Sequence, residues 1–441
     1  MYRLIFKDLE EWKDKKDRKP LILQGVRQCG KTWALTAFGH QAFEDTAYFN
    51  LESSTTYQNI FENDLDPERI IIELGILRNK AIIPGTTFLI LDEIQSCPRA
   101  LTALKYFCEN MPKLHIAAAG SLLGVAVTQM GKDISFPVGK VDIQTLYPLN
   151  FEEFLRANGE DLLCDTLRTA ETVPISFQKK LEGYYQHYLI TGGMPEPVRS
   201  WIATHDVADV DKILDDIISD YEKDFIKYAP SSEFPKLMQI WNGVPGQLAR
   251  ENQKFIFSHI KRGARAKDLE DALYWLISSG LIYKVMKTEQ PFIPLTVHAD
   301  SSFFKIYLAD TGILRKLAGF PASAITDTAK SSAYMRGMLA ENFVLTELIA
   351  IRAFTPDALC FWKSNNTAEI DYLLQHELEV IPIEVKSGKN THAKSLYEYR
   401  KRYLPKITVR TSLQPLAHHT TETGTVHEIP LPLLWNLNHY L

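Results

Sequence analysis

The sequence predicts an α/β fold with a doubly wound parallel sheet in its N-terminal third. Residues 33–38 have the periodicity of a helix, and a glycine-rich octapeptide, Gly25-Val-Arg-Gln-Cys-Gly-Lys-Thr32, lies directly before them. Strands that alternate with helices build an open parallel sheet with helices on both faces. Four short apolar runs have the length and composition of the strands: 20–24, 46–52, 87–95 and 114–119.

The octapeptide is a candidate phosphate-binding loop. It fits the P-loop pattern G-x-x-x-x-G-K-[ST] and lies between a strand and a helix, which is the context that this motif requires. Backbone N–H groups of such a loop face the phosphates, the lysine reaches the β- and γ-phosphates, and the Ser/Thr hydroxyl binds Mg²⁺. A glycine turn with a surface lysine is the structural alternative. We predict ATP and Mg²⁺ binding by these residues: Gly25, Arg27, Gln28, Cys29, Gly30, Lys31 and Thr32.

A second nucleotide motif is predicted at 87–95, where an apolar run ends in two acids. A central parallel strand of this kind delivers carboxylates to the C-terminal edge of the sheet. Together with a P-loop it is typical of a Walker B segment. Asp92 would then hold the Mg²⁺ shell, and Glu93 would polarise the attacking water as general base. The alternative is a strand end with two solvated acids.

Composition excludes several classes of protein. The 441 residues suffice for two to four domains, and the net charge of −5 rules out a polycation that binds nucleic acid over its whole surface. The five cysteines include no CxxC pair, so we expect neither a disulfide framework nor a thiolate zinc site. The longest apolar run, 116–127, is too short to span a bilayer, and no signal peptide is recognisable. We therefore expect a cytoplasmic protein with no membrane partner.

Several segments resemble a bacterial and archaeal family of AAA-type ATPases whose chains end in a PD-(D/E)XK nuclease-like domain. The segments are the P-loop, "LDEIQ" at 91–95, the turn at 120–123, "LYPLNFEEFL" at 146–155 and "ITGGMPE" at 190–196. The resemblance covers essentially the whole chain. One position departs from it, because Lys140 stands where the family usually has an arginine, and lysine is a poorer bidentate phosphate clamp.

Ser121 follows the fourth apolar run, where AAA-type ATPases keep a polar residue that senses the γ-phosphate. A turn serine that caps the next helix is the alternative. The "LNFEEFL" segment also has a structural interpretation, because Asn150 and Glu153 form the pattern of a helix capping box. The predicted catalytic residues are Lys31, Glu93 and Ser121.

The middle segment resembles a winged helix. A helix is predicted at 267–278 and a strand at 281–286, separated by Ser279-Gly280. Basic residues gather just upstream and could contact DNA phosphates, although a solvated helix face explains them equally well. These residues are Lys254, Lys261, Arg262, Arg265 and Lys267.

The C-terminal segment matches the spacing of a PD-(D/E)XK nuclease core. Strands are predicted at 368–374 and 380–387, carrying Asp371 on one and Glu384 and Lys386 on the other. Two carboxylates on adjacent strands can hold Mg²⁺, and a lysine two residues further along one strand lies on the same face. Glu341, on a predicted helix, would approach this cluster. The alternatives are a surface ion pair and an inactive nuclease fold.

We thus predict four units: an AAA-type P-loop ATPase domain (1–158), a helical lid or linker (159–230), a winged-helix-like domain (231–325) and a restriction-endonuclease-like α/β domain (326–441). The expected function is Mg²⁺-dependent ATP hydrolysis that acts on or at DNA, with oligomers possible through the ATPase domain. A regulatory nucleotide switch with inactive C-terminal domains is the main alternative. A P-loop kinase fits less well, because Glu93 beside Asp92 suits attack by water. His418 and His419 are expected in a threonine-rich loop without metal.

Overall fold

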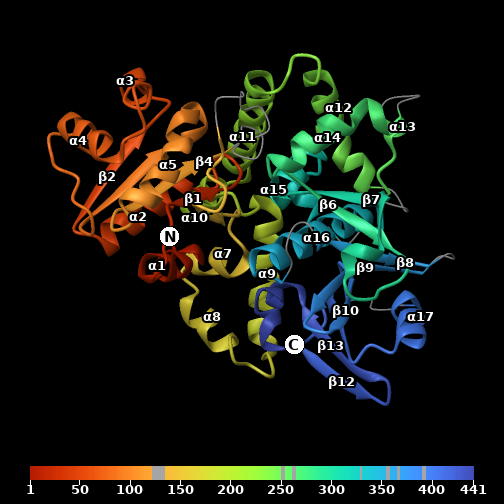
Figure 1. Ribbon diagram of the computed structural model, residues 1–441. Helices are drawn as coiled ribbons and strands as arrows, with labels where there is room; N and C mark the ends of the chain where they lie inside the picture. The colour runs from red at the N-terminus through yellow and green to blue at the C-terminus, as the bar shows by residue number, and fades with distance from the viewer. Residues whose placement is uncertain are drawn as a thin grey trace. The chain divides into compact units, whose positions relative to one another are not determined.

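In a computed structural model the chain folds into two compact units (Figure 1). The first unit comprises residues 2–147 and 278–280, and the second comprises residues 148–277 and 281–441. No helix among the described residues is both long and apolar enough to cross a membrane. The described residues are 1–121, 135–249, 254–260, 265–327, 330–353, 358–364, 368–389 and 394–441.

A five-stranded parallel sheet of order β2-β3-β4-β1-β5 forms the centre of the first unit. Each predicted strand of this region is present, which confirms the parallel α/β arrangement. The strands are β1 (Leu21–Gln24), β2 (Asp45–Asn50), β3 (Thr87–Asp92), β4 (His115–Gly120) and β5 (Asp142–Thr145). The helices are α1 (Ile5–Asp14), α2 (Lys31–Ala42), α3 (Thr55–Asn59), α4 (Pro67–Leu77) and α5 (Pro98–Asn110), with a 3₁₀ turn η1 (Ile94–Ser96).

Helices cover both faces of this sheet. On one face, Phe38 of α2 and Trp12 of α1 both pack against Phe88 of β3, with ring centroids 5.9 and 6.0 Å apart. On the other face, Leu89 and Leu91 belong to a cluster of buried side chains that includes residues of α4 and α5. Because both faces of the sheet are buried, its strands have nearly continuous apolar sequences, and such runs are recognisable in the sequence.

The second unit begins with helices and continues into a sheet. The aromatic rings of Phe151, Tyr185, Tyr188 and Phe343 pack together and join α7, α9 and α16. The α-helices are α7 (Phe151–Ala157), α8 (Asp161–Leu167), α9 (Ile175–Thr191), α10 (Pro195–Thr204), α11 (Val207–Tyr228), α12 (Phe234–Leu248), α13 (Phe257–Ile260), α14 (Ala266–Ser278), α15 (Thr311–Leu317), α16 (Lys330–Ala350) and α17 (Lys394–Tyr403), followed by 3₁₀ turns in η5 (Leu431–His439).

The sheet of the second unit is mixed and has eight strands in the order β12-β13-β11-β10-β9-β8-β6-β7. Met286 of the β6–β7 hairpin pairs with Cys360 of β8, so the strand predicted at 281–286 joins the same sheet as the C-terminal strands. The strands are β6 (Ile282–Thr288), β7 (Ala299–Leu308), β8 (Cys360–Lys363), β9 (Glu369–His376), β10 (Glu379–Val385), β11 (Ile407–Ser412), β12 (Ala417–Thr421) and β13 (Gly424–Pro430).

The strands β9 and β10, which carry Asp371 and Glu384, lie in the interior of this sheet, between β8 and β11. One expectation differs from this architecture. His418 and His419 lie on β12 rather than in a loop, because this segment pairs with β13 as a hairpin. The Nδ1 atoms of His418 and its cross-strand neighbour His427 are 2.7 Å apart.

Candidate functional site

The P-loop adopts a backbone that needs its glycines. Gly25 and Gly30 have φ values of 151° and 97°, where residues with a side chain are strained. A Cβ atom on Gly25 would also lie 2.2 Å from the Leu146 carbonyl oxygen. Gln28 takes a positive φ of 64° without being glycine. The strained turn directs the chain from β1 into α2, whose N-terminus begins at Lys31.

Lys31 is buried and bonded to its own loop. Its ammonium donates to the carbonyl oxygens of Gly25 and Val26 at 3.0 and 2.9 Å. The residue is only 7% exposed. These two carbonyls hold the cation over the loop, where a bound phosphate could exchange for them.

Asp92, at the end of β3, is the acceptor that joins the two predicted motifs. Its Oδ2 atom accepts hydrogen bonds from the Thr32 hydroxyl and the Tyr48 hydroxyl, both at 2.8 Å. The hydroxyl of Thr32 and the carboxylate of Asp92 are the oxygen ligands expected around Mg²⁺ beside a triphosphate, so this pair fits the ion. Burial and the hydrogen bond to Asp92 raise the pKa of Tyr48 to about 12. Tyr48 is a site residue that the sequence did not reveal.

Glu93 lies in the left-handed region of the backbone, with a φ of 51°. Its N–H donates to the Asp92 carboxylate at 3.0 Å, and its own carboxylate accepts a short hydrogen bond from the Gln95 side chain. Gln95 therefore holds the predicted general base. Ser121 directly follows β4, and β4 lies between β1 and β3 in the sheet. This order brings Ser121 to the same edge of the sheet as the P-loop and the two acids.

Contacts distant in sequence also support the P-loop. The buried guanidinium of Arg3 donates to the carbonyl oxygens of Cys29 at 2.9 Å and Tyr147 at 2.6 Å. The Cys29 thiol donates to the Leu146 carbonyl at 3.4 Å. Arg27, by contrast, is exposed. Arg3 has no local motif around it, so sequence reasoning had no signal by which to find it.

Lys140, at the position of the expected arginine finger, forms an ion pair within its own unit. Its ammonium lies 2.9 Å from the Glu109 carboxylate, and the hydrogen bond raises its pKa. Both side chains are well exposed. Lys140 would have to leave Glu109 to contact a phosphate.

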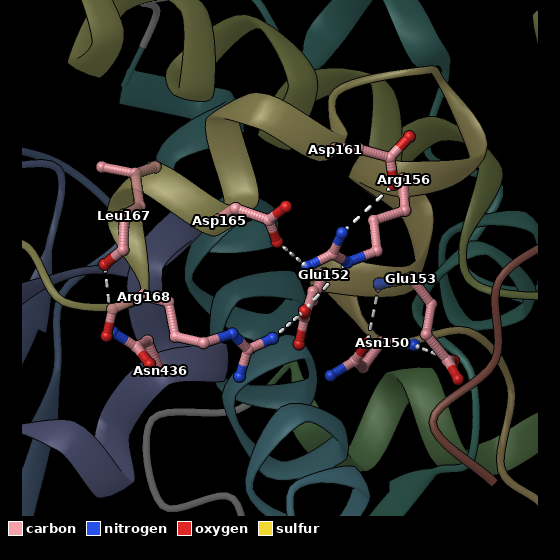
Figure 2. Close-up of polar contacts among 9 residues, drawn as sticks. All are labelled: Asn150, Glu152, Glu153, Arg156, Asp161, Asp165, Leu167, Arg168 and Asn436. Atoms are coloured by element: carbon pink, nitrogen blue, oxygen red, sulfur yellow. Dashed lines mark hydrogen bonds and ion pairs between the residues drawn. The ribbon is translucent and has the colours of Figure 1, made fainter. Parts of the chain in front are cut away.

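The "LNFEEFL" segment has the predicted capping box at the start of α7 (Figure 2). The Asn150 side chain accepts from the Glu153 N–H at 2.9 Å, and the Glu153 carboxylate accepts from the Asn150 N–H at 3.2 Å. Arg156, on the same helix, contacts Asp161 at 3.1 Å and Asp165 at 2.6 Å. These contacts fix α7 against α8 and explain this motif without a ligand.

The second cluster of interest is at the ends of β9 and β10. The Lys386 ammonium lies 2.6 Å from the Glu384 carboxylate, so these two side chains share a face as predicted. Asp371 accepts a 2.7 Å hydrogen bond from the Val385 N–H. Burial raises the pKa of both carboxyl groups, and the charge of Asp371 raises that of Glu384 further. The structure thus brings Asp371, Glu384 and Lys386 together.

Glu341 of α16 approaches the same cluster. Its carboxylate accepts from the Tyr307 hydroxyl at 3.0 Å, and its charge acts on both Glu384 and Lys386. One oxygen of Glu384 is buried and has no hydrogen-bond partner, which is the kind of atom that a cation satisfies. No group of three or more His, Cys, Asp or Glu side chains in the described ranges is close enough to hold a metal. Mg²⁺ needs only one or two carboxylates, with water filling its other positions, so the pair of Asp371 and Glu384 still fits it.

The predicted DNA-contacting basic cluster is only partly described. Lys261 and Arg262 lie outside the described residues. Arg265 and Lys267 are exposed at the start of α14, and the Arg265 N–H donates to Asp268 at 2.8 Å. Lys254 lies elsewhere, over the ring of Phe303 on β7.

Comparisons with known families agree with the order of these units. Residues 17–155 match a family described as an AAA domain, residues 182–324 match a domain of unknown function (DUF8612), and residues 336–434 match another (DUF4143). The chain therefore has an AAA-type P-loop ATPase domain followed by two domains of unknown function. No curated protein matches the chain in sequence.

Solved structures resemble the chain only distantly. The Walker-type ATPase PABY2304 of Pyrococcus abyssi is 15% identical, with a TM-score of 0.43, over 71% of this chain and 94% of that one. AMPPCP-bound DnaA from Aquifex aeolicus is 15% identical, with a TM-score of 0.26, over 63% and 87% of the two chains. The Orc1 protein of Aeropyrum pernix in complex with DNA is 10% identical, with a TM-score of 0.25, over 73% and 91%.

Proposed function

We propose that the chain is a Mg²⁺-dependent ATPase that acts at DNA through a winged-helix-like segment and a nuclease-like carboxylate site. The observation that carries the ATPase proposal is the convergence of Lys31, Thr32, Asp92, Glu93 and Ser121 at one edge of a parallel sheet. When bound between Thr32 and Asp92, Mg²⁺ would screen the charge of the triphosphate.

The residues have separable tasks in this proposal. Lys31 would exchange its two carbonyl partners for phosphate oxygens, and the N–H groups at the start of α2 would bind the same phosphates. Glu93 would accept the proton of the attacking water once its carboxylate is released from Gln95. Ser121 would contact the γ-phosphate. The carboxylate of Glu93, beside Asp92, suits activation of water. This arrangement supports hydrolysis of ATP over transfer of its phosphate to a second substrate.

The nuclease-like site is supported by the pairing of Asp371 with Glu384 and by the partnerless oxygen of Glu384. In this proposal the two carboxylates hold Mg²⁺, and Lys386 orients the attacking water. The helices α12 and α14, followed by the β6–β7 hairpin, support the winged-helix interpretation of the preceding segment.

Two activities measured on one preparation test the proposal. Phosphate release from ATP is measured with and without DNA, and Mg²⁺-dependent nicking of supercoiled DNA is measured in parallel. Lys31→Ala should remove only phosphate release, and Asp371→Ala should remove only nicking. Absence of phosphate release from the wild type would refute the ATPase proposal. Phosphate release without nicking would refute the nuclease activity and favour a nucleotide switch with an inactive C-terminal site.

A further inference from the structure

Three lysines converge on one phenylalanine ring of the second sheet. The ammonium groups of Lys254, Lys287 and Lys363 lie 4.2, 5.0 and 5.9 Å from the centre of the Phe303 ring. The lysines come from three separate segments: the residues before α13, strand β6 and strand β8. We define these four residues as the lysine–Phe303 cluster.

The lysines of this cluster are partly withdrawn from water. The side chains of Lys287 and Lys363 keep 11% and 17% of their exposure, whereas most surface lysines extend into solvent. Each ammonium gains some attraction from the ring, but like charges gathered at one place also repel one another. Such a gathering favours an anion that contacts more than one lysine.

Nearby carboxylates neutralise the cluster only in part. Glu289 lies 2.6 Å from Lys287, and Glu369 lies 2.7 Å from Lys363. Glu369 also forms an ion pair with the buried ammonium of Lys305, at 2.5 Å, and is therefore shared between two lysines. The charges of Lys287 and Lys254 also act on Asp300. The charges of Glu341 and Asp371 also act on Lys305, so Lys305 is compensated, whereas the Lys254 ammonium makes no ion pair with any described residue.

The cluster is continuous with the carboxylate site. The Phe303 and Phe361 ring centres are 6.0 Å apart, and the Lys305 ammonium lies 4.8 Å from the centre of the Phe361 ring. Glu369 and Asp371 are two residues apart on β9, which is about 7 Å along a strand. A chain with regularly repeated phosphates could therefore contact the lysine–Phe303 cluster and the Asp371 site together.

We propose that the lysine–Phe303 cluster binds backbone phosphates of a DNA strand beside the Asp371–Glu384 site. This inference rests on the proposed nuclease-like function for its choice of DNA over other polyanions. It assigns DNA contact to strands β6, β7 and β8 together with Lys254, the one residue of the predicted basic cluster that takes part. The lysines bind phosphate without reading bases, so affinity should not depend on sequence.

The chain contains a matched control lysine. Lys284 lies on the same strand as Lys287 and lies 4.4 Å from the centre of the ring of Phe304. Phe304 packs against Phe255 and Phe257, whereas Phe303 packs against Phe361. Lys284→Gln therefore removes the same charge and the same type of ring contact from a different aromatic group.

The test compares DNA binding by the double variant Lys254→Gln/Lys287→Gln with binding by Lys284→Gln and by the wild type. A fluorescein-labelled 20-nucleotide strand and its duplex are titrated with the full chain in EDTA, without nucleotide, over a range of salt. The double variant should bind the strand at least tenfold more weakly, with a salt slope smaller by about 1.4 for two lost phosphate contacts on a single strand. Lys284→Gln should match the wild type.

Three outcomes would overturn the proposal: equal affinity of the double variant and the wild type, an equal loss in Lys284→Gln, or displacement of DNA by polyglutamate at the same charge concentration. Circular dichroism establishes that each variant is folded. Phe303→Leu keeps the three lysine charges but removes the aromatic ring, so it should weaken binding by a smaller factor than the double lysine variant does. Because binding is measured without Mg²⁺ and ATP, failure of nicking or of phosphate release leaves this result interpretable.

Discussion

Replacement of Lys31 has an effect on nucleotide affinity that can be worked from its contacts. The ammonium now bonds two neutral carbonyl oxygens, of Gly25 and Val26, at 3.0 and 2.9 Å. In the ATP complex, charged phosphate oxygens would take the place of these two neutral acceptors. Two bonds between charged partners, of about 3 kcal/mol each, would be gained, and two bonds from the ammonium to neutral carbonyls, of about 1.5 kcal/mol each, given up, a difference of about 3 kcal/mol. Lys31→Ala should therefore weaken ATP binding about 150-fold.

Titration of a fluorescent ATP analogue with Mg²⁺ measures this difference. Lys31→Gln is a second variant, because it keeps an N–H donor for the Gly25 carbonyl and so separates loss of charge from loss of the loop's own bonds. Lys140→Ala is the matched control, since Lys140 is already paired with Glu109 and should leave affinity unchanged. Binding by Lys31→Ala within threefold of the wild type would refute the phosphate-cradle assignment.

Three further results are expected. Gln95→Ala should raise basal phosphate release severalfold because it frees Glu93, and an unchanged or lower rate would contradict a restraining role. Asp310 is the buried N-cap of α15, and burial raises its pKa from 3.8 to about 6. The free energy of unfolding that the protonated carboxyl contributes is therefore lost as pH rises from about 4 to 6. The free energy of unfolding, measured by urea denaturation, should vary with pH by about 3 kcal/mol less in Asp310→Asn than in the wild type. The same variation in both proteins would contradict the burial argument. Reversing the charge of Arg265 should weaken binding to DNA of any sequence by the same factor. Unchanged binding would contradict the DNA contact predicted for that residue.

Local patterns in the sequence predict much of the first unit and its site. Gly25, Gly30 and Lys31 are recognisable because each has a task that only its residue type performs, within eight consecutive positions. The capping box of Asn150 and Glu153 is predictable for the same reason, since its partners are three residues apart. Each of these signals is contained within a single turn or loop.

Long-range contacts explain what the sequence could not predict. Tyr48 reaches Asp92 because β2 and β3 are neighbours, and Arg3 reaches Tyr147 across nearly the whole first unit. The pairing of β6 with β8 joins segments some 75 residues apart, so no local pattern announces an eight-stranded sheet. Lys305, which holds Glu369 beside the carboxylate site, comes from β7 and could be linked to that site only through this pairing.

The central claim is that Glu93 is the base for ATP hydrolysis in a site that binds ATP through other residues. Single-turnover hydrolysis of γ-labelled ATP by the wild type and by Glu93→Gln, with bound ATP measured in the same samples by filter binding, tests it most directly. Glu93→Gln should bind ATP with wild-type affinity and hydrolyse it at least 100-fold more slowly, as expected when only a general base is lost. Hydrolysis at the wild-type rate would contradict the account.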